Sequence, residues 1–97
     1  MKTVVIQIGN TDDKLRQFEW SLFCQDLSSV VRMCCHDVHF NGFSLGDAPW
    51  QNHCVVATCN DLNRLSLNLE QLCVKHGQDS IALIVGDTVF VSPNKNI

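Results

Sequence analysis

Cysteine and histidine side chains, the residue types that ligate zinc or act as nucleophiles, gather in the middle of this sequence. The segment CCHDVH (34–39) carries four of them, and His53-Cys54 and Cys73-x-x-His76 add further ligand types. A structural zinc site needs four nitrogen or sulfur ligands that converge on one point. Adjacent cysteines on a strand point to opposite faces, and the sequence contains no C-x-x-C pair. We therefore expect no metal site and no cofactor.

A catalytic thiol is the second kind of chemistry that these residues suggest. A reactive thiolate needs a cationic neighbour or a helix N-terminus, together with some exposure to solvent. Cys34 and Cys35 lie between Arg32 and His36, which favours such a role. They also lie where a helix is expected to meet a strand, in a place that should be packed. Phosphate-binding loops, nucleophile elbows and the H-E-x-x-H motif are absent, so we predict that the protein is not an enzyme.

The segment LGDAPWQNH (45–53) is the leading candidate for a binding site. Pro49 stiffens the backbone before Trp50, and a tryptophan on a stiff loop is typical of residues that anchor interfaces or stack on flat ligands. Polar neighbours would supply hydrogen-bond donors and acceptors around it. The predicted binding residues are Asp47, Trp50, Gln51, Asn52 and His53. In the alternative, Trp50 folds back over one end of the core and Asn52 bonds the turn backbone.

Composition and charge limit the partners and the compartment. The seven lysines and arginines are scattered and the net charge is −3, so we expect no nucleic-acid partner. No apolar run approaches the ~18 residues that span a bilayer, and the opening MKTVVIQIGN is expected to form the first strand rather than a secretory signal. We predict a cytoplasmic protein that does not enter the membrane. Its six cysteines should be reduced thiols, most of them in the core.

Hydrophobic periodicity predicts one domain over residues 1–97. Strands are expected at 3–8, 34–44, 53–59 and 80–85. Helices are expected at 12–33, capped by Thr11 or Asp12, and at about 61–76, capped by Asn60 or Asp61 and ended by Gly77. Gly86-Asp87 is typical of a tight hairpin turn, which would lead into a last short strand at 89–91.

This order of elements predicts an α+β fold, a ferredoxin-like βαββαβ sandwich with an extra C-terminal hairpin strand. Both helices would lie on one face of an antiparallel sheet, and the other face would stay open unless something covers it. One-sided sheets of this kind often pair with a second copy, an analogy at the level of the fold.

The first predicted helix carries two apolar faces. Its core stripe consists of Trp20, Phe23, Cys24, Leu27, Val30, Val31 and Cys34. A second group, Leu15, Phe18, Leu22 and Met33, lies more than about 90° from the centre of that stripe. This second patch either sits under a loop or forms an interface.

These features favour a non-enzymatic interaction module. We expect it to act as a homodimer on an unidentified protein partner, with the second patch of the first helix as an interface. Its composition is typical of small inhibitors, immunity proteins and phage or mobile-element accessory proteins. The alternative is a regulatory domain that binds or sequesters a small ligand near residues 45–53.

Overall fold

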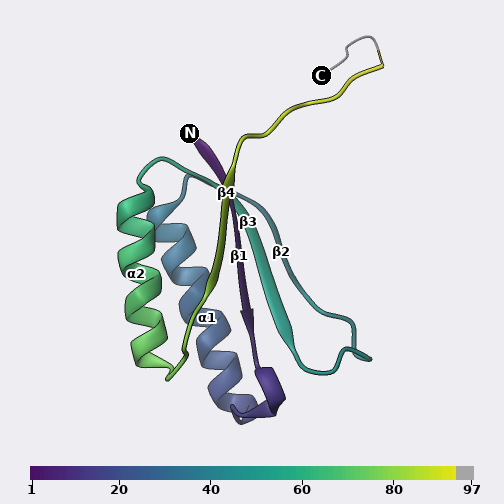
Figure 1. Ribbon diagram of the computed structural model, residues 1–97, viewed down its shortest axis with the longest axis vertical. Helices are drawn as coiled ribbons and strands as arrows, with labels where there is room; N and C mark the ends of the chain where they lie inside the picture. The colour runs from purple at the N-terminus through teal and green to yellow at the C-terminus, as the bar shows by residue number, and fades with distance from the viewer. Residues whose placement is uncertain (94–97) are drawn as a thin grey trace.

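Two helices and four strands follow one another along the chain of the computed structural model, which describes residues 1–93 (Figure 1). The elements are β1 (Lys2–Gly9), a 3₁₀ turn (Thr11–Asp13), α1 (Gln17–Cys34), β2 (Asp37–Phe43), β3 (Asn52–Cys59), α2 (Leu62–Lys75) and β4 (Ala82–Gly86). The strands form one antiparallel sheet in the order β2-β3-β1-β4. Both helices pack on the same face of this sheet, which confirms the predicted α+β architecture and is compatible with the ferredoxin-like fold.

Alternation along the two central strands explains why one face of the sheet is covered. In β1, Val4, Ile6 and Ile8 point toward the helices and are buried, whereas the side chains between them are more exposed. β3 follows the same pattern. The other members of the single buried cluster are Trp20, Phe23, Cys24, Leu27, Val31, Cys34, Val55, Ala57, Cys59, Leu65, Leu69 and Leu72.

α1 begins at Gln17, five residues later than the predicted start at residue 12. The predicted capping residues, Thr11 and Asp12, instead lie in the 3₁₀ turn Thr11–Asp13, where Asp12 and Asp13 adopt positive φ angles of 58° and 51°. The helix is capped further along the chain: the backbone N–H of Arg16 donates to a Glu19 carboxylate oxygen over 2.9 Å. A glutamate in the first turn also suits the positive end of the helix.

Asn10 explains why the helix cannot begin earlier. Its buried side chain accepts a hydrogen bond from the backbone N–H of Leu15 over 2.8 Å and donates to the carbonyl of the same residue over 3.0 Å. These two bonds hold the chain between β1 and α1 as a closed loop. Buried polar groups need such partners, so the loop geometry follows from the burial of one amide.

α2 has the predicted ends. The Asp61 carboxylate accepts a hydrogen bond from the backbone N–H of Arg64 over 3.0 Å, as an N-cap does. At the other end, Gly77 has φ of +61°, and the backbone N–H of Gln78 donates to the Cys73 carbonyl over 2.8 Å. This is the Schellman arrangement in which a glycine ends a helix.

The predicted hairpin strand at 89–91 is wrong. Residues 87–93, which we call the C-terminal arm, contain no strand and lead away from the body of the molecule (Figure 1). The first residues of the arm stay beside β1, because Lys2 Nζ contacts an Asp87 oxygen at 2.8 Å and the Thr3 and Thr88 hydroxyls share a hydrogen bond. The chain therefore continues straight past Gly86 instead of turning back along β4.

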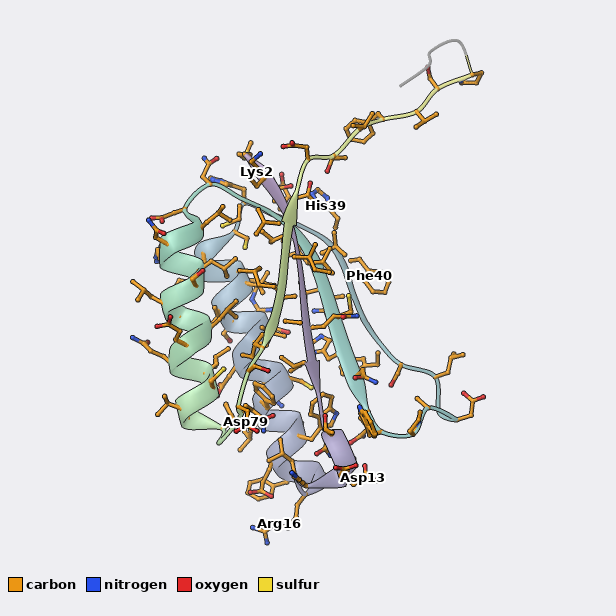
Figure 2. All side chains as sticks on the ribbon, in the orientation of Figure 1. Lys2, Asp13, Arg16, His39, Phe40 and Asp79 are labelled. Atoms are coloured by element: carbon orange, nitrogen blue, oxygen red, sulfur yellow. The ribbon has the colours of Figure 1, made fainter. Side chains whose placement is uncertain are left out.

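β2 is the edge strand on the opposite side of the sheet. It begins at Asp37 rather than residue 34, because Cys34 still belongs to α1. The pairing of β2 with β3 is shifted between Val38 and Phe40, so that His39 forms a bulge. Figure 2 labels His39 and Phe40 along this strand, on the side of the molecule away from α2. Bulges interrupt an edge that would otherwise pair with other chains.

Candidate functional site

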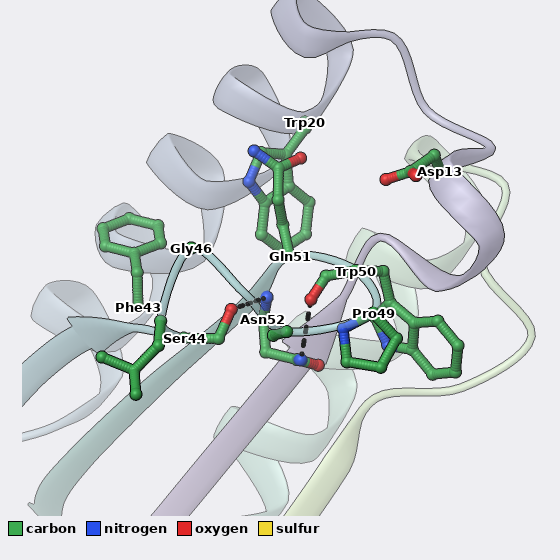
Figure 3. A pocket seen from close by; sticks show the side chains of 11 residues that line it. Asp13, Trp20, Phe43, Ser44, Gly46, Pro49, Trp50, Gln51 and Asn52 are labelled. Carbon is green, nitrogen blue, oxygen red and sulfur yellow. Dashed lines mark hydrogen bonds between the residues drawn. The ribbon is translucent and has the colours of Figure 1, made fainter.

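Three of the five predicted binding residues line one cavity of about 580 Å³ at the β2–β3 loop (Figure 3). We call it the loop cavity; Trp50, Gln51 and Asn52 lie on its loop side. Trp20 of α1 and Phe43 of β2 form further walls. Asp47 is exposed and does not line this cavity.

The polar side chains of the loop are already used to hold the loop together. The amides of Gln51 and Gln17 bond each other reciprocally over 2.9 and 3.0 Å, which ties the loop to α1. Asn52 Nδ2 donates to the Trp50 carbonyl over 3.3 Å, and the Asn52 backbone N–H donates to Ser44 Oγ over 2.9 Å (Figure 3). These contacts favour the interpretation of the segment as an elaborate turn.

Trp50 packs back against β1. A side chain at Gly9 would lie 3.6 Å from the indole Nε1, so glycine leaves room for the ring at the end of this strand. The indole is half-buried. It therefore covers one end of the sheet, as the alternative interpretation of the sequence expects, while one part of it still borders the loop cavity.

His53 lies apart from the other four predicted binding residues. It sits on the inner face of β3 with only 1% of its surface exposed, and its Nε2 is hydrogen-bonded to Asn41 Oδ1. The Phe43 ring stacks on the imidazole with centroids 4.4 Å apart and planes 15° from parallel. Burial lowers the pKa of His53 below its ordinary value, so the neutral ring is favoured.

One nitrogen of this imidazole lacks a partner. Because Asn41 Oδ1 accepts, Nε2 carries the proton, and Nδ1 presents a lone pair. Within the described residues, nothing donates a hydrogen bond to Nδ1, and it is the one buried side-chain polar atom there without a partner. Such an atom in a native structure calls for an explanation, and a ligand is one of them.

His53 borders a second cavity of about 610 Å³ between α1 and β2, which we call the α1–β2 groove. Trp20 and Phe43 separate it from the loop cavity, because both residues line both hollows. Its other lining residues are Gln17, Ser21, Cys24, Gln25, Ser28, Ser29, Arg32, Asn41 and His53. A smaller hollow of about 120 Å³ shares three residues with it and extends it along the helix. The sequence did not indicate this groove, because the two elements that line it are brought together only by the fold.

The predicted interface residues of α1 differ in their surroundings. Phe18, Leu22 and Met33 are exposed, whereas Leu15 is half-buried and packs against the core. The three exposed side chains share a helix face and form what we call the α1 patch. The guanidinium of Arg16 lies 5.8 Å from the centre of the Phe18 ring at one end of the patch.

A second apolar surface, which sequence reasoning missed, crosses the open face of the sheet. Phe40, Val56, Val5 and Ile84 are successive cross-strand partners in β2, β3, β1 and β4, and we call them the outer row. Phe40 and Ile84 are 54% and 58% exposed. Gly42 leaves the space that the Phe40 ring occupies. The signal in the sequence was present, because apolar residues stand at the outward positions of all four strands.

The structure describes the surroundings of all six cysteines that the sequence raised as chemical candidates. All six thiols are free. Burial raises the pKa of Cys24 to about 11 and that of Cys35 to about 12, which keeps both protonated and poorly nucleophilic near neutral pH. Among residues 1–93, no group of three histidine, cysteine or acidic side chains is placed to hold a metal ion.

No protein-family model matches this sequence, and no curated protein matches it either. Among solved structures, the chain is similar to the crystal structure of the At3g17210 protein from Arabidopsis thaliana, with a TM-score of 0.52 and 14% sequence identity. The match covers 94% of this chain and 97% of that one. At this identity the likeness shows the fold alone, and it extends over nearly the whole of both chains. In the part of this chain that the structure describes, neither helix has the length and apolar character to cross a membrane.

Proposed function

We propose that this protein is a non-enzymatic interaction module of the small inhibitor or accessory type, which acts in the cytoplasm as a homodimer on a protein partner. The observation that carries the proposal is the outer row, an apolar line across all four strands on the uncovered face of the sheet. Six free thiols are typical of a reducing compartment and support the cytoplasmic location.

A second copy is the occupant that the open face favours. Burial of the outer row would stabilise an assembly by roughly 25 cal/mol for each Å² of apolar surface removed from water. Contiguous apolar patches of this kind usually mark interaction sites. Two such sheets packed face to face would cover both rows at once. The surface is then self-complementary, as the interface of a two-fold dimer must be.

The C-terminal arm supports the same assembly. Val89, Phe90 and Val91 are 58%, 87% and 68% exposed on a segment that leaves the body of its own chain (Figure 1). These residue types favour strands, and an extended segment can add to the edge of another sheet. In the proposed dimer, the arm of one copy lies along an edge of the sheet of the other.

The α1 patch is proposed as the surface that meets the protein partner. It lies on the helix layer, which is the face opposite to the outer row (Figure 1). A dimer formed through the sheets would therefore leave Phe18, Leu22 and Met33 exposed on both of its outer sides. The same patch is also the rival candidate for the dimer interface, so the test must separate the two surfaces.

Sedimentation equilibrium of two matched variants makes this separation. Val5→Lys with Ile84→Lys places charges in the outer row and is expected to yield monomers, because two facing charged rows repel and lose their apolar contact. Phe18→Ser with Leu22→Ser changes the α1 patch instead and is expected to leave the dimer intact. If the outer-row variant stays dimeric and the α1-patch variant is monomeric, the dimer interface lies on α1 instead. If the unmodified protein is monomeric at about 100 µM, a dimer of useful affinity is excluded.

Small-ligand binding is a second candidate function, and a specific observation favours it. Two adjoining cavities meet at Trp20 and Phe43, and beneath Phe43 lies a buried imidazole with an unpartnered nitrogen. A ligand in either cavity should change the fluorescence of Trp20 or Trp50. Titration of the protein with a panel of small organic acids, followed by tryptophan emission, tests this function. A flat emission across the whole panel would argue against it.

A further inference from the structure

A third cavity, which we call the end cavity, lies beside the last residues of β1. Its volume of about 470 Å³ is within the range of small-molecule sites. Three segments line it: the end of β1 with the turn that follows, the first residue of β3, and the loop between α2 and β4. It shares Asn52 with the loop cavity and no residue with the α1–β2 groove, so it is a separate hollow.

Two residues of opposite charge line the end cavity. Lys14 and Asp79 are the charged residues in its wall. Neither belongs to an ion pair among residues 1–93, so more than 4 Å separates the ammonium of one from the carboxylate of the other. Figure 2 labels Asp79 and Asp13, the neighbour of Lys14, at the same end of the molecule. A ligand that carries both charges would give each of these side chains a partner.

The size of the end cavity fits the two charges of an α-amino acid. A compact hollow of about 470 Å³ is about 10 Å across. An α-amino acid with a contact of about 2.8 Å at its ammonium and another at its carboxylate bridges about 8 Å. Lys14 is exposed, and its flexible four-carbon stem can adjust to the ligand. The cavity therefore has room for both charged groups and for a side chain.

The end of β1 offers backbone groups to the same ligand. The N–H of Asn10 donates to the Gln51 carbonyl over 2.8 Å, on the β3 side of the strand. Neighbouring residues of an antiparallel strand direct their backbone groups to opposite sides, so those of Gly9 point toward β4. β4 begins at Ala82, which pairs with Gln7, and Gly9 therefore extends past the end of β4. Backbone N–H and C=O groups need hydrogen-bond partners, and a ligand in the end cavity would supply them.

Polar side chains also gather around Gly9. A Cβ at this position would lie 2.9 Å from Asn52 Oδ1 and 3.6 Å from Thr11 Oγ1. The Asn52 amide donates through Nδ2 to the Trp50 carbonyl, which leaves Oδ1 as an acceptor. The Thr11 hydroxyl, on an exposed residue, can donate or accept. This pair matches an amide group, which donates through its nitrogen and accepts through its oxygen.

We propose that the end cavity binds a free α-amino acid with an amide side chain, such as glutamine. Its carboxylate pairs with Lys14, its ammonium pairs with Asp79, and its amide lies beside Gly9, near Asn52 and Thr11. From its α-carbon to its amide an extended glutamine reaches about 5 Å, so all three groups fit within a hollow about 10 Å across. This inference rests on the second proposed function, ligand binding, and names a further cavity and the class of ligand that it takes.

NMR titration of the whole protein with four small molecules tests the proposal. The probes are L-glutamine; glutaramate, which lacks the α-ammonium; 4-aminobutanamide, which lacks the α-carboxylate; and L-norleucine, which lacks the amide. We expect saturable shifts at Gly9, Thr11 and Ser80 with glutamine, and at least threefold weaker binding of each of the other probes. A probe that binds as tightly as glutamine would contradict the contact whose group it lacks.

Two variants assign each charge of the ligand to its partner. Lys14→Gln should weaken glutamine and glutaramate at least threefold and should not weaken 4-aminobutanamide. Asp79→Asn should weaken glutamine and 4-aminobutanamide at least threefold and should not weaken glutaramate. Both side chains are exposed and outside every ion pair of residues 1–93, so we expect both variants to fold. Arg64→Gln and Asp47→Asn are the matched controls, because these exposed charges do not line the cavity and their loss should change no affinity.

The outcomes separate this inference from the function on which it rests. Saturable shifts confined to Ser28 and Phe43 would place the ligand in the α1–β2 groove, which overturns the end-cavity site and keeps ligand binding. No shift with any probe up to about 50 mM would overturn the amino-acid proposal. In that case a response of tryptophan emission to one of the small organic acids would still support the broader function, and a flat emission would argue against both.

Discussion

Burial of the His53 imidazole makes the stability of this protein depend on pH. Because burial lowers the pKa of His53 from its ordinary 6.5, the folded state binds fewer protons than the unfolded state in acid. The stabilisation from the neutral ring is fully present above pH 6.5 and is lost as the pH falls toward the lowered pKa. We expect the free energy of unfolding to fall below pH 6.5, by no more than about 1.4 kcal/mol per pH unit from this group.

Urea denaturation between pH 7 and pH 5 measures this slope, and His53→Gln should flatten it. The Asp26 carboxylate does not interfere, because Lys75 and His76 lower its pKa from an ordinary 3.8, so it loses its charge only below the window. An equal slope in the unmodified protein and in His53→Gln would show that other groups cause the acid sensitivity.

A single buried amide, that of Asn10, should hold the loop before α1. Asn10→Ala removes both hydrogen bonds between the Asn10 side chain and Leu15, and the backbone N–H and carbonyl of Leu15 then lack these partners. We expect a loss of about 1–3 kcal/mol in the free energy of unfolding. Asn60→Ala changes an exposed asparagine between β3 and α2 and should cost much less. Similar losses for both variants would contradict the role assigned to Asn10.

At the scale of single residues, the sequence predicted which residues form the β2–β3 loop better than it predicted which of their side chains are free to bind. It predicted binding residues at Trp50, Gln51 and Asn52, with the alternative that Asn52 bonds the turn backbone. The structure shows the side-chain amide of Gln51 bonded to Gln17 and that of Asn52 bonded to the Trp50 carbonyl, which agrees with the alternative. These partners lie up to 34 residues away in the sequence. Side-chain pairing over such a distance is a property of the fold, so residue types alone cannot reveal it.

Among the elements, α2 gives the clearest test of local sequence rules. Gly77→Ala should destabilise the protein by about 1–2 kcal/mol, because an alanine must adopt φ near +61° there. Gly46→Ala is the matched control, since its backbone has no positive φ and a new Cβ would meet nothing within 4 Å. Thermal or urea unfolding of both variants checks this. A loss at position 46 as large as that at 77 would refute the explanation.

Hydrophobic periodicity and helix caps predict the helices and strands, except where contacts with other segments of the chain determine the path of the backbone. The helices and strands were predicted at nearly their observed places, because alternation and the 3.6-residue repeat report the faces that the core covers. The predicted hairpin turn at Gly86-Asp87 is absent from the structure, and that prediction was wrong. A hairpin needs a second strand that gains by pairing with the first, and here Lys2 and Thr3 of β1 hold Asp87 and Thr88 instead.

The dimensions of the whole molecule reflect its open surfaces. Its radius of gyration is 14.7 Å, against about 12.5 Å expected for a compact chain of this length. The extents of 49 × 33 × 18 Å show a thin two-layered body lengthened by the arm (Figure 1). A shape of this kind leaves much apolar surface in contact with water, which agrees with the proposed homodimer.

Removing the C-terminal arm should weaken this assembly without unfolding the body. A chain that ends at Asp87 loses Val89, Phe90 and Val91, which are exposed and outside the buried cluster. We expect the dissociation constant of the dimer to rise at least tenfold, and the unfolding of the monomer to change by less than about 0.5 kcal/mol. Sedimentation equilibrium and urea denaturation measure the two effects. An unchanged dimer would remove the arm from the interface.

The order of elements was enough to predict the sandwich, but not the outer row. Whether outward side chains of four strands line up depends on the register of each pair, and register is set by tertiary packing. The same reasoning applies to the α1–β2 groove, which exists because β2 lies beside α1 at the edge of the sheet. The structure shows an exposed apolar row on this face, and its covering by a second copy is the proposal that remains to be tested.

The molar mass of the unmodified protein in solution tests the central claim most directly. Light scattering coupled to size-exclusion chromatography, on reduced protein at several concentrations, gives this mass without any substitution. We predict twice the mass of one chain at concentrations above a few micromolar. A mass equal to that of the single chain throughout the range would contradict a homodimer and leave the outer row without its proposed occupant.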